Sequence, residues 1–469
     1  MTAPAVLAPA GVAGLLADAA AREPGIEILA PSSATVDYRY DAATRRTAEP
    51  GETGPAVALP ATVAEVQAVV LLAAAHGVTV VPRGAGSGLA GGASAGADQL
   101  VLSTERLARI VEVSPLDEVA VVEPGVLNAA LNSHLAPYGL FYAPDPASFE
   151  ISSLGGNIAT NAGGLRCAKY GVTRESVLAL DVVLADGSLV SIGHRSIKGV
   201  TGLDLVSLVV GSEGVLGVVV GATLRLRPLP VARRTVSAFF DSTEAGALGL
   251  AAITRSPVRP SVVEFLDERT LVGIDRHAGS DLRSRGASLV LVELDGYGID
   301  EQLADLRVAL GEAGGRVEQE SDEGGAALWE LRRHGRGFDP RTAFAGGDVA
   351  VPKSRLPEVF AFFGELEERH GVEIAAVAHA GDGNLHPLVT KDVPDEAGRA
   401  VAESVVHDVA AEIARYALSV GGTVSGEHGI GSTKRELAEI ELAARVRALQ
   451  HAIKSAFDPE ALLNPGKAL

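Results

Sequence analysis

The sequence has very little cysteine and too little positive charge to balance its acidic residues. Its one cysteine, Cys167, excludes a disulfide within the chain and is typical of a reducing compartment. The 40 lysines and arginines are outnumbered by 59 acidic residues, which gives the 469-residue chain a formal net charge of −19. Nucleic acids and anionic membrane surfaces are bound through basic faces. The charge balance therefore argues against both as main partners.

Long hydrophobic runs are missing as well. No apolar stretch reaches the roughly 18 residues of a membrane-spanning helix. The N-terminal stretch MTAPAVLAPAGVAGLLADAA is apolar, but no basic residue precedes Arg22. A secretory signal peptide requires such a positive flank. We therefore expect a cytoplasmic protein that does not insert into a membrane, and attachment to a membrane-bound partner stays open.

Helix and strand patterns alternate irregularly in the first half of the chain. A helix follows the capping box of Thr62 and Glu65 and ends at Gly77. A second helix ends at Gly139. Strands are predicted over 78–81, over 107–125 on both sides of the turn SPLDE, and over 177–193 as a hairpin that turns at Asp186-Gly187. This mixture indicates an α+β fold rather than a doubly wound parallel sheet.

The pattern changes after the PLP tripeptide near residue 230. Strands are predicted over 236–242, 262–267, 288–294 and 316–321, with helices near 244–255 and 300–313, and the last part of the chain is helical. We expect a helical lead-in over 1–50, a first domain over 51–230, a second α+β domain over 231–400, and a C-terminal helical segment over 401–469.

A glycine loop, VPRGAGSGLAGG (81–92), follows one of the predicted strands. It is either a plain turn or a diphosphate cradle, because glycines let backbone N–H groups turn inward as an anion nest. Arg83 and Ser87 would add donors. The usual dinucleotide fingerprint needs a helix directly after the loop. More glycine follows here, which argues against a nicotinamide-type Rossmann site.

Two further segments share this glycine-rich character. PDPASFEISSLGGNIATNAGGLRCAKYG (144–171) carries two Gly-Gly pairs, two asparagines and several hydroxyls. It either forms a long ordered surface loop or lies against a planar ligand and hydrogen-bonds the ligand's edge. GSEGVLGVVVGA (211–222) joins glycine turns to a buried strand.

Together the three segments resemble the flavin-binding domain of the vanillyl-alcohol oxidase/p-cresol methylhydroxylase (PCMH) superfamily. The resemblance runs from about residue 50 to 230 and implies a PCMH-type FAD-binding domain over 51–230. Relatives that attach FAD covalently use His or Cys, and the segment from Arg83 to Gly92 contains neither, so we expect non-covalent FAD. Cys167 is better explained as a small packed side chain. The resemblance implies FAD contacts for Pro82, Arg83, Gly84, Ala85, Gly86, Ser87, Gly88, Leu89, Pro144, Ser148, Gly155, Gly156, Thr160, Ala162, Gly163, Glu213 and Val219.

The nonapeptide HAGDGNLHP (379–387) holds two histidines seven residues apart. Its glycines oppose a helix, and on a straight strand the two side chains would point to opposite faces. A hairpin that turns at Asp382-Gly383 would pair His379 directly with His386, with Cβ atoms roughly 4.5–5.5 Å apart. Two imidazoles in that position can both bind one metal ion.

A metal requires further ligands, and SGEHGIGSTK (425–434) supplies Glu427 and His428 between glycines. Two histidines and one carboxylate leave coordination positions open, as catalytic sites do. Zn²⁺ is the first choice, and Mn²⁺, Co²⁺ and Fe²⁺ accept the same ligands. The alternative for any single histidine is a hydrogen-bonded structural role.

Both histidine segments resemble the C-terminal signatures of the FAD-linked 2-hydroxyacid dehydrogenases, a group that includes D-lactate dehydrogenase, D-2-hydroxyglutarate dehydrogenase and the glycolate oxidase flavoprotein subunit. The likeness extends to the terminal FDPEALLNPGK. It implies a substrate (cap) domain over 231–400 and C-terminal helices that return to the FAD domain. It also implies roles for particular residues: metal ligands His379, His386 and Glu427, the base His428, a flavin contact from Asn464, and a substrate carboxylate bound by Arg332 of the W-x-x-R motif, with Arg333 as the neighbouring alternative.

The resemblance implies metal-assisted oxidation of a D-2-hydroxy acid to the 2-oxo acid, with hydride transfer to flavin N5. Hydroxyglutarate enzymes carry a lysine where this chain has Gly346 or Gly347, which favours a D-lactate- or glycolate-like substrate. Alternatives are another hydroxy acid or alcohol, a metal-dependent hydrolase, and an FAD-carrying subunit of a multi-subunit oxidase. The electron acceptor is a quinone, a cytochrome, an electron-transfer flavoprotein or oxygen, and a homodimer is the default assembly.

Overall fold

The computed structural model describes residues 11–47, 49–334, 341–393 and 395–469. The predicted lead-in contains helix α1 (Val12–Arg22), and its residues 1–10 and 48 lie outside the described residues. The chain divides into two compact units, each described by itself below. The first unit holds the chain up to Ala162, Val172–Leu229 and His428–Leu469, and the second holds Gly163–Gly171 and Pro230–Glu427.

A mainly parallel sheet forms one core of the first unit. Strands β2 (Ala56–Ala58), β4 (Leu100–Ser103) and β3 (Val80–Arg83) run parallel, and β1 (Ile28–Leu29) pairs antiparallel with β2. Helix α2 (Val63–Ala75) begins where the side chain of Thr62 accepts a hydrogen bond from the N–H group of Glu65, 3.2 Å away, which is one half of the predicted capping box. The carboxylate of Glu65 accepts a hydrogen bond from the N–H group of Ala61 (2.7 Å). The helix residues Val66, Val69 and Val70 are buried in the core of this sheet.

An antiparallel sheet forms the other core of the first unit. Its strand order is β5 (Ile110–Ser114), β6 (Val119–Val122), β10 (Val218–Arg225), β8 (Val177–Val183) and β9 (Leu189–Gly193). The predicted pair around SPLDE and the predicted hairpin at Asp186-Gly187 are both confirmed. Short strands β7 (Leu140–Phe141) and β11 (Arg227–Pro228) pair with each other.

The last part of the chain, His428–Leu469, belongs to the first unit, as predicted for the C-terminal helices, whereas 401–427 of the predicted C-terminal segment belongs to the second unit. The N–H group of Val80 in β3 donates to the carbonyl oxygen of Leu462 (2.8 Å), and the N–H group of Asn464 donates to the carbonyl oxygen of Val80 (2.7 Å). The remaining helices of the unit are η1 (Ser33–Arg39), α3 (Asn128–Leu135), η2 (Ala136–Tyr138), α4 (Leu154–Thr160), α6 (Thr173–Ser176), α7 (Leu205–Val209), α15 (Arg435–Glu441) and α16 (Ala444–Phe457).

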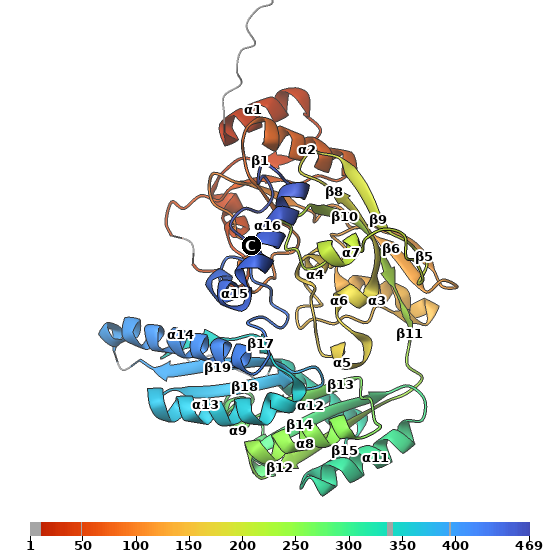
Figure 1. The fold of residues 1–469 in the computed structure, drawn as a ribbon, viewed down its shortest axis with the longest axis vertical. Helices are drawn as coiled ribbons and strands as arrows, with labels where there is room; N and C mark the ends of the chain where they lie inside the picture. Colours follow the sequence, from red (N-terminus) through yellow and green to blue (C-terminus); the bar gives the residue numbers. More distant parts are fainter. Residues whose placement is uncertain (1–10, 48, 335–340, 394) are drawn as a thin grey trace, which may run out of the picture. The chain divides into compact units, whose positions relative to one another are not determined.

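The second unit is built on one large antiparallel sheet (Figure 1). Its strand order is β15 (Arg316–Gln319), β12 (Arg233–Phe240), β14 (Ser288–Asp295), β13 (Val262–Leu266), β18 (Glu373–His379), β19 (Asn384–Asp392) and β16 (Thr342–Gly346), with β17 (Val349–Ala350) paired to β19. The strands predicted near 236–242, 262–267, 288–294 and 316–321 are all present.

Helices cover both faces of this sheet. On one face, Val262 and Leu266 pack with Trp329 of α12 (Asp322–His334) and with residues of α9 (Glu268–Ala278). On the other face, Phe265 meets Phe360 of α13 (Leu356–His370) edge-to-face at a centroid distance of 4.8 Å. Because strand side chains alternate, Glu264 lies on the α9 and α12 face with Val262 and Leu266.

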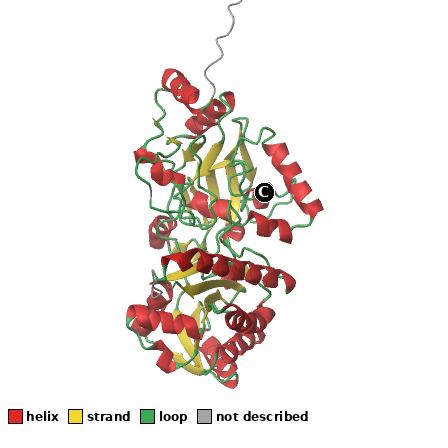
Figure 2. Ribbon diagram, turned by 90° about the vertical axis from the view of Figure 1, so that its left-hand side faces the viewer, coloured by secondary structure: helices red, strands yellow, loops and turns green. Residues whose placement is uncertain are grey.

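Strands and helices mix in both units (Figure 2), so the chain has the predicted α+β fold. No described helix has both the length and the apolar character needed to cross a membrane. The other helices of the second unit are α5 (Cys167–Tyr170), α8 (Thr243–Arg255), α10 (Leu282–Arg285), α11 (Ile299–Glu312), η3 (Lys353–Arg355) and α14 (Glu396–Ser419).

Candidate active site

Strands β18 and β19 form the predicted hairpin, but the predicted register is wrong. His379 pairs with Asn384, and His386 pairs with Val377. The observed register is displaced by two residues from direct pairing of the histidines. A displacement of two leaves every side chain on its original face, because side chains alternate with a period of two. The histidines are therefore diagonal neighbours on one face, with ring centroids 5.0 Å apart.

The loop between the strands explains the difference. It runs over 380–383 instead of the predicted two-residue turn, because the carbonyl oxygen of His379 accepts hydrogen bonds from both Asp382 and Gly383 (3.2 and 3.0 Å). Gly383 has a φ of +93°, which favours glycine. The N–H group of Gly381 donates to the carbonyl oxygen of Val263 on β13 (3.2 Å), so the sheet itself holds the loop.

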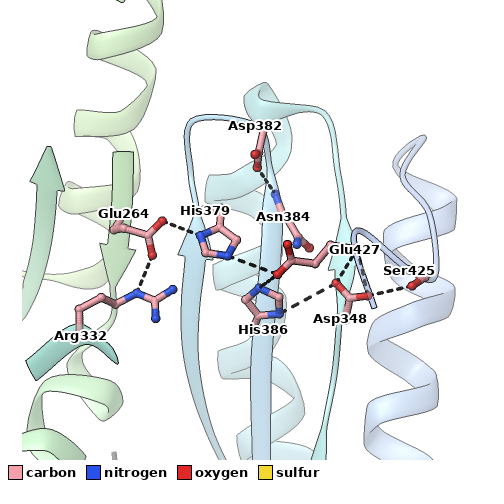
Figure 3. A network of polar contacts seen from close by, with 9 residues as sticks. All are labelled: Glu264, Arg332, Asp348, His379, Asp382, Asn384, His386, Ser425 and Glu427. Carbon is pink, nitrogen blue, oxygen red and sulfur yellow. Dashed lines mark hydrogen bonds and ion pairs between the residues drawn. The ribbon is translucent and has the colours of Figure 1, made fainter. Parts of the chain in front are cut away.

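The two histidines and Glu427 converge on one point in the second unit (Figure 3). Atom Oε1 of Glu427 lies 3.5 Å from Nε2 of His379 and 3.2 Å from Nε2 of His386. Tetrahedral ligands about 2.0–2.1 Å from a metal ion are themselves separated by about 3.3 Å. The donor set and its spacing therefore fit a divalent cation.

The charges around this point favour a cation. Burial alone would lower the pKa of His379, but the carboxylates of Glu264 and Glu427 raise it well above its usual value. Burial would raise the pKa of Glu427, but hydrogen bonds from His379 and His386 hold it well below its usual value. Burial raises the pKa of nearby Asp382 to about 6. The carboxylate of Glu264, which is buried, and that of Glu427, which is mostly buried, thus favour positive charge at this point.

Glu264 is a buried carboxylate that the sequence analysis missed. It is the direct cross-strand partner of His379, and its Oε1 lies 2.6 Å from Nδ1 of that histidine. Its Oε2 accepts a hydrogen bond from Nε of Arg332 at 2.5 Å (Figure 3). A carboxylate at Nδ1 fixes the orientation of an imidazole and directs Nε2 toward a metal. Glu264 therefore links the candidate metal ligand His379 to Arg332.

The W-x-x-R motif places Arg332 through its tryptophan. Trp329 is buried against the sheet, and its indole N–H group donates to Oγ1 of Thr235 on β12 (3.1 Å). Arg332 follows on α12, is buried, and forms its ion pair with Glu264 through Nε. The bond to Glu264 leaves the two Nη groups as separate donors.

Asp348 is a second buried carboxylate that the sequence analysis did not assign. It accepts hydrogen bonds from the hydroxyl of Ser425 (2.8 Å) and from the backbone N–H of Glu427 (3.3 Å). One of its oxygens lies 4.0 Å from Nδ1 of His386. Asp348 therefore places a buried negative charge near His386, at a distance longer than a hydrogen bond. The signal in the sequence was an acidic residue directly before the apolar stretch VAV (349–351), because buried carboxylates require partners.

His428 directly follows Glu427 in the chain and begins the segment that belongs to the first unit. Two residues later, the backbone N–H groups of Ile430 and Gly431 both donate to the buried carboxylate of Glu213, each at 2.7 Å. Burial raises the pKa of Glu213, and these two hydrogen bonds oppose the rise.

In the glycine loop after β3, the backbone lies too close to neighbouring atoms to leave room for a side chain at Gly84. A Cβ atom on Gly84 would lie 2.3 Å from Oγ of Ser153, and Gly86 has a φ of +70°. The guanidinium of Arg83 donates to the carbonyl oxygens of Tyr40 and Ala93 (2.9 and 3.1 Å), so this side chain holds the loop in place. Any Arg83 contact to a diphosphate would therefore come from its backbone.

Two buried polar atoms near the other predicted flavin contacts could accept hydrogen bonds from the edge of a planar ligand. Oδ1 of Asn464 and Oδ1 of Asn157 are buried and have no hydrogen-bond partner among the described residues. Most of the predicted contacts belong to the first unit, on β3 and its loop, on or before α4, and on β10. Gly163 belongs to the second unit instead, and a Cβ atom on it would lie 2.5 Å from Oε2 of Glu427.

Comparison with known protein families agrees with both parts of the chain. Residues 55–193 match the FAD binding domain, and residues 229–468 match the C-terminal domain of the FAD linked oxidases. The glycolate oxidase subunit GlcD of Bacillus subtilis is 36% identical over 440 residues, covering 92% of this chain and 91% of that protein. The D-lactate dehydrogenase of Archaeoglobus fulgidus is 33% identical over 453 residues, covering 95% and 97%. The D-2-hydroxyglutarate dehydrogenase of Xanthomonas citri pv. viticola is 35% identical over 428 residues, covering 88% of each.

Solved structures show the same fold at low identity. A p-cresol methylhydroxylase with bound substrate matches with a TM-score of 0.76 at 16% identity, covering 98% of this chain and 97% of that one. The 4-ethylphenol oxidase of Gulosibacter chungangensis matches with a TM-score of 0.75 at 19% identity, covering 99% and 98%. The chain therefore belongs to the family of FAD-linked oxidases and is an FAD-dependent oxidoreductase with a PCMH-type fold.

Proposed function

We propose that the protein oxidises a D-2-hydroxy acid, D-lactate- or glycolate-like, to the 2-oxo acid with the help of a divalent metal ion. The observation that carries this proposal is the convergence of His379, His386 and Glu427, with Arg332 joined to the same histidine through Glu264. A 2-hydroxy acid has adjacent hydroxyl and carboxylate oxygens. A metal ion and a guanidinium together suit such a substrate.

The metal ion would be held by His379, His386 and Glu427. Zn²⁺ is the first choice because two imidazoles and one carboxylate leave open positions for a substrate, and Mn²⁺, Co²⁺ or Fe²⁺ suit the same ligands. The bound ion would supply Lewis-acid chemistry, which lowers the pKa of a hydroxyl group. Glu264 keeps the imidazole of His379 oriented from behind.

Arg332 binds the substrate carboxylate in this proposal. A guanidinium presents donors in a planar fork that matches a carboxylate. Its Nε group already donates to Glu264, which holds the plane of the fork in one orientation. The Nη groups are then the donors for the substrate.

His428 accepts the hydroxyl proton as the general base. It is bonded directly to Glu427 in the chain, which keeps the base within one residue of a metal ligand. An unperturbed imidazole has a pKa of about 6.5 and is mostly neutral at physiological pH. When bound, FAD supplies the acceptor for the α-hydrogen, which leaves the substrate with its electron pair. An external electron acceptor then reoxidises the cofactor, and a quinone, a cytochrome, an electron-transfer flavoprotein and oxygen are all candidates.

The choice of substrate rests on the side chains near β16. The relatives named above act, by their names, on glycolate, D-lactate and D-2-hydroxyglutarate. Gly346 and Gly347 offer no side chain that could bind a second carboxylate. A Cβ atom on Gly346 would have no described atom within 4 Å, so the residue is not needed for packing. We therefore place glycolate and D-lactate ahead of D-2-hydroxyglutarate.

An anaerobic titration tests the proposal. Purified FAD-loaded protein is mixed with glycolate, D-lactate, L-lactate or D-2-hydroxyglutarate, and the flavin absorbance near 450 nm (roughly, a cofactor property) is followed. We expect D-lactate or glycolate alone to bleach the flavin. A yellow protein bleached by none of the acids would contradict the proposal and favour a different substrate or an FAD-carrying subunit. A colourless protein would favour a metal-dependent hydrolase.

Replacing the carboxylate behind His379 is expected to weaken metal binding. In Glu264→Gln the imidazole loses its charged partner, and outer-shell changes of this kind cost roughly 10- to 100-fold in metal affinity. The measurement is zinc content after dialysis against graded zinc buffers. Glu320→Gln is the matched control, because Glu320 also accepts hydrogen bonds from an arginine, Arg285 of α10, and from a serine, Ser237 of β12. Equal zinc affinity in the two variants would remove Glu264 from this role.

Adding a methyl group at Gly163 is expected to disturb Glu427 directly. A Cβ atom there would lie 2.5 Å from Oε2 and 3.2 Å from Cβ of Glu427, so the carboxylate must move. We expect Gly163→Ala to lose roughly tenfold or more in zinc affinity, as misplaced metal partners do. Gly273→Ala in α9 is the control, because a Cβ atom at Gly273 would meet no described atom within 4 Å. Unchanged zinc affinity in Gly163→Ala would contradict the contact.

A further inference from the structure

We propose that Glu213 is a positioning residue that holds the loop carrying His428, and this proposal rests on the function proposed above. All of the contacts lie within the first unit. The two carboxylate oxygens of Glu213 accept hydrogen bonds from consecutive backbone N–H groups, Oε1 from Ile430 and Oε2 from Gly431, each at 2.7 Å. Hydrogen bonds to a charged acceptor are about twice as strong as neutral ones.

Glycines allow the carboxylate to approach the loop this closely. A Cβ atom on Gly429 would lie 3.1 Å from Oε1 of Glu213, and one on Gly92 would lie 3.2 Å from Oε2. A Cβ atom on Gly431 would lie 1.9 Å from the carbonyl oxygen of Ala90. Side chains at these three positions would come too close to their neighbours, so glycine allows the loop to lie against Glu213 and Ala90.

Glu213 is itself held in a strained conformation. Its φ of +52° is unusual for a residue with a side chain. Its N–H group donates to the carbonyl oxygen of Ala159 (2.8 Å), and its carbonyl oxygen accepts a hydrogen bond from the side chain of Asn464 (2.7 Å). Strain of this kind persists where the surrounding structure fixes it, and it is concentrated at functional sites. The backbone is thus fixed in the position that directs the carboxylate to the loop.

The loop is fixed again just beyond these contacts. The N–H groups of Ser432 and Thr433 both donate to the carbonyl oxygen of Ala90 (2.9 and 3.2 Å). His428 lies two residues before the first of the Glu213 contacts, at the N-terminal side of the fixed stretch. Glu213 therefore acts on the proposed base through the backbone that carries it, without any need to contact substrate.

The test uses FAD-loaded protein and the variant Glu213→Gln. The glutamine keeps the shape of the side chain but turns an NH₂ group toward one of the loop N–H groups. We expect the amides of the 428–434 peptide to exchange with deuterium roughly tenfold to a hundredfold faster, as loss of a hydrogen bond to a charged group implies. We expect the limiting rate of flavin reduction by D-lactate or glycolate to fall about tenfold or more, with the half-saturating acid concentration changed less than about twofold, because Arg332 is untouched.

A double variant separates positioning from a merely structural role. If Glu213 acts through His428, then Glu213→Gln has no further effect on reduction in a His428→Ala background. Asp275→Asn is the matched control, because the carboxylate of Asp275 also accepts hydrogen bonds from two consecutive backbone N–H groups, those of Leu282 and Arg283 (2.8 and 2.7 Å), at the start of α10, which holds no proposed site residue. That control should change neither loop exchange at 428–434 nor flavin reduction.

Several results would overturn the proposal. Unchanged exchange in Glu213→Gln would show that the carboxylate does not hold the loop. An unchanged reduction rate, or an equal loss in the His428→Ala background, would show that the loop contact does not act on the base. Should Glu213→Gln fail to retain FAD, Glu213→Asp keeps the charge while withdrawing it from the loop, and the same comparisons apply. If neither acid reduces the wild-type flavin, the proposed function fails and the positioning role fails with it.

Discussion

His428→Ala is expected to slow flavin reduction by the hydroxy acid by roughly 10²–10⁴-fold, the usual loss when a general base is removed. The variant should remain yellow, because no predicted flavin contact is changed. Rapid mixing of the anaerobic protein with D-lactate or glycolate measures the rate. The residual rate should also depend on pH differently from the wild-type rate, because no imidazole at position 428 then accepts the hydroxyl proton.

The control for this experiment is another histidine of the same unit. His451 is exposed on α16, and His451→Ala should reduce flavin at the wild-type rate. A His428→Ala variant that matches the wild-type rate would remove His428 from the role of base. The metal site and the flavin would then need another group to accept the hydroxyl proton.

Removal of the metal ion is expected to produce the second large effect. Dialysis against a chelator, or His386→Ala, should lower the rate of flavin reduction by about a hundredfold or more, because Lewis-acid stabilisation contributes several kcal/mol and each 1.36 kcal/mol is tenfold in rate. Adding Zn²⁺ should restore the dialysed wild-type protein and leave His386→Ala inactive. The flavin content should not change in either case.

An exposed histidine of the second unit provides the comparison. His407 lies on α14, and His407→Ala should keep its metal ion and its rate. Full activity of a protein shown to be metal-free would contradict the metal-assisted reaction. It would leave His379, His386 and Glu427 as a hydrogen-bonded structural cluster.

The candidate metal ligands could be predicted because their signal is local. If the nonapeptide forms a hairpin, its two histidines lie on the same face of the sheet whenever their register differs from direct pairing by an even number of residues. The register could not be predicted, because Gly381 is held by the carbonyl oxygen of Val263 from a different part of the chain. The predicted register was wrong by two residues, but the two histidines still lie on the same face. Only a displacement by an odd number of residues would have placed them on opposite faces.

The carboxylate behind His379 illustrates what one sequence leaves undetermined. Glu264 is 115 residues before His379, and their contact depends on the pairing of β13 with β18. The sequence shows a glutamate inside an apolar strand, which predicts a buried and partnered charge. It does not show which residue is the partner.

Local sequence patterns also could not predict which segments of the chain belong to which unit. Gly163–Gly171 continues the glycine-rich flavin segment in sequence but belongs to the second unit. Asp295, at the end of β14, binds both the ammonium of Lys169 and the hydroxyl of Tyr170. This ion pair, between a buried aspartate and an exposed lysine, joins positions that are 126 residues apart. Elements with local signals, such as the Thr62 cap and the Asp186-Gly187 hairpin, were in contrast predicted correctly.

The most direct test is zinc K-edge X-ray absorption on the purified, FAD-loaded protein, compared with His386→Ala. We predict one tightly held zinc ion whose nearest shell contains two imidazole nitrogens and oxygen ligands at about 2.0–2.1 Å. We also predict that the oxygen part of this shell changes when D-lactate or glycolate is added to protein whose flavin is already reduced. A retained zinc ion without imidazole ligands, or the same spectrum in His386→Ala, would contradict the account.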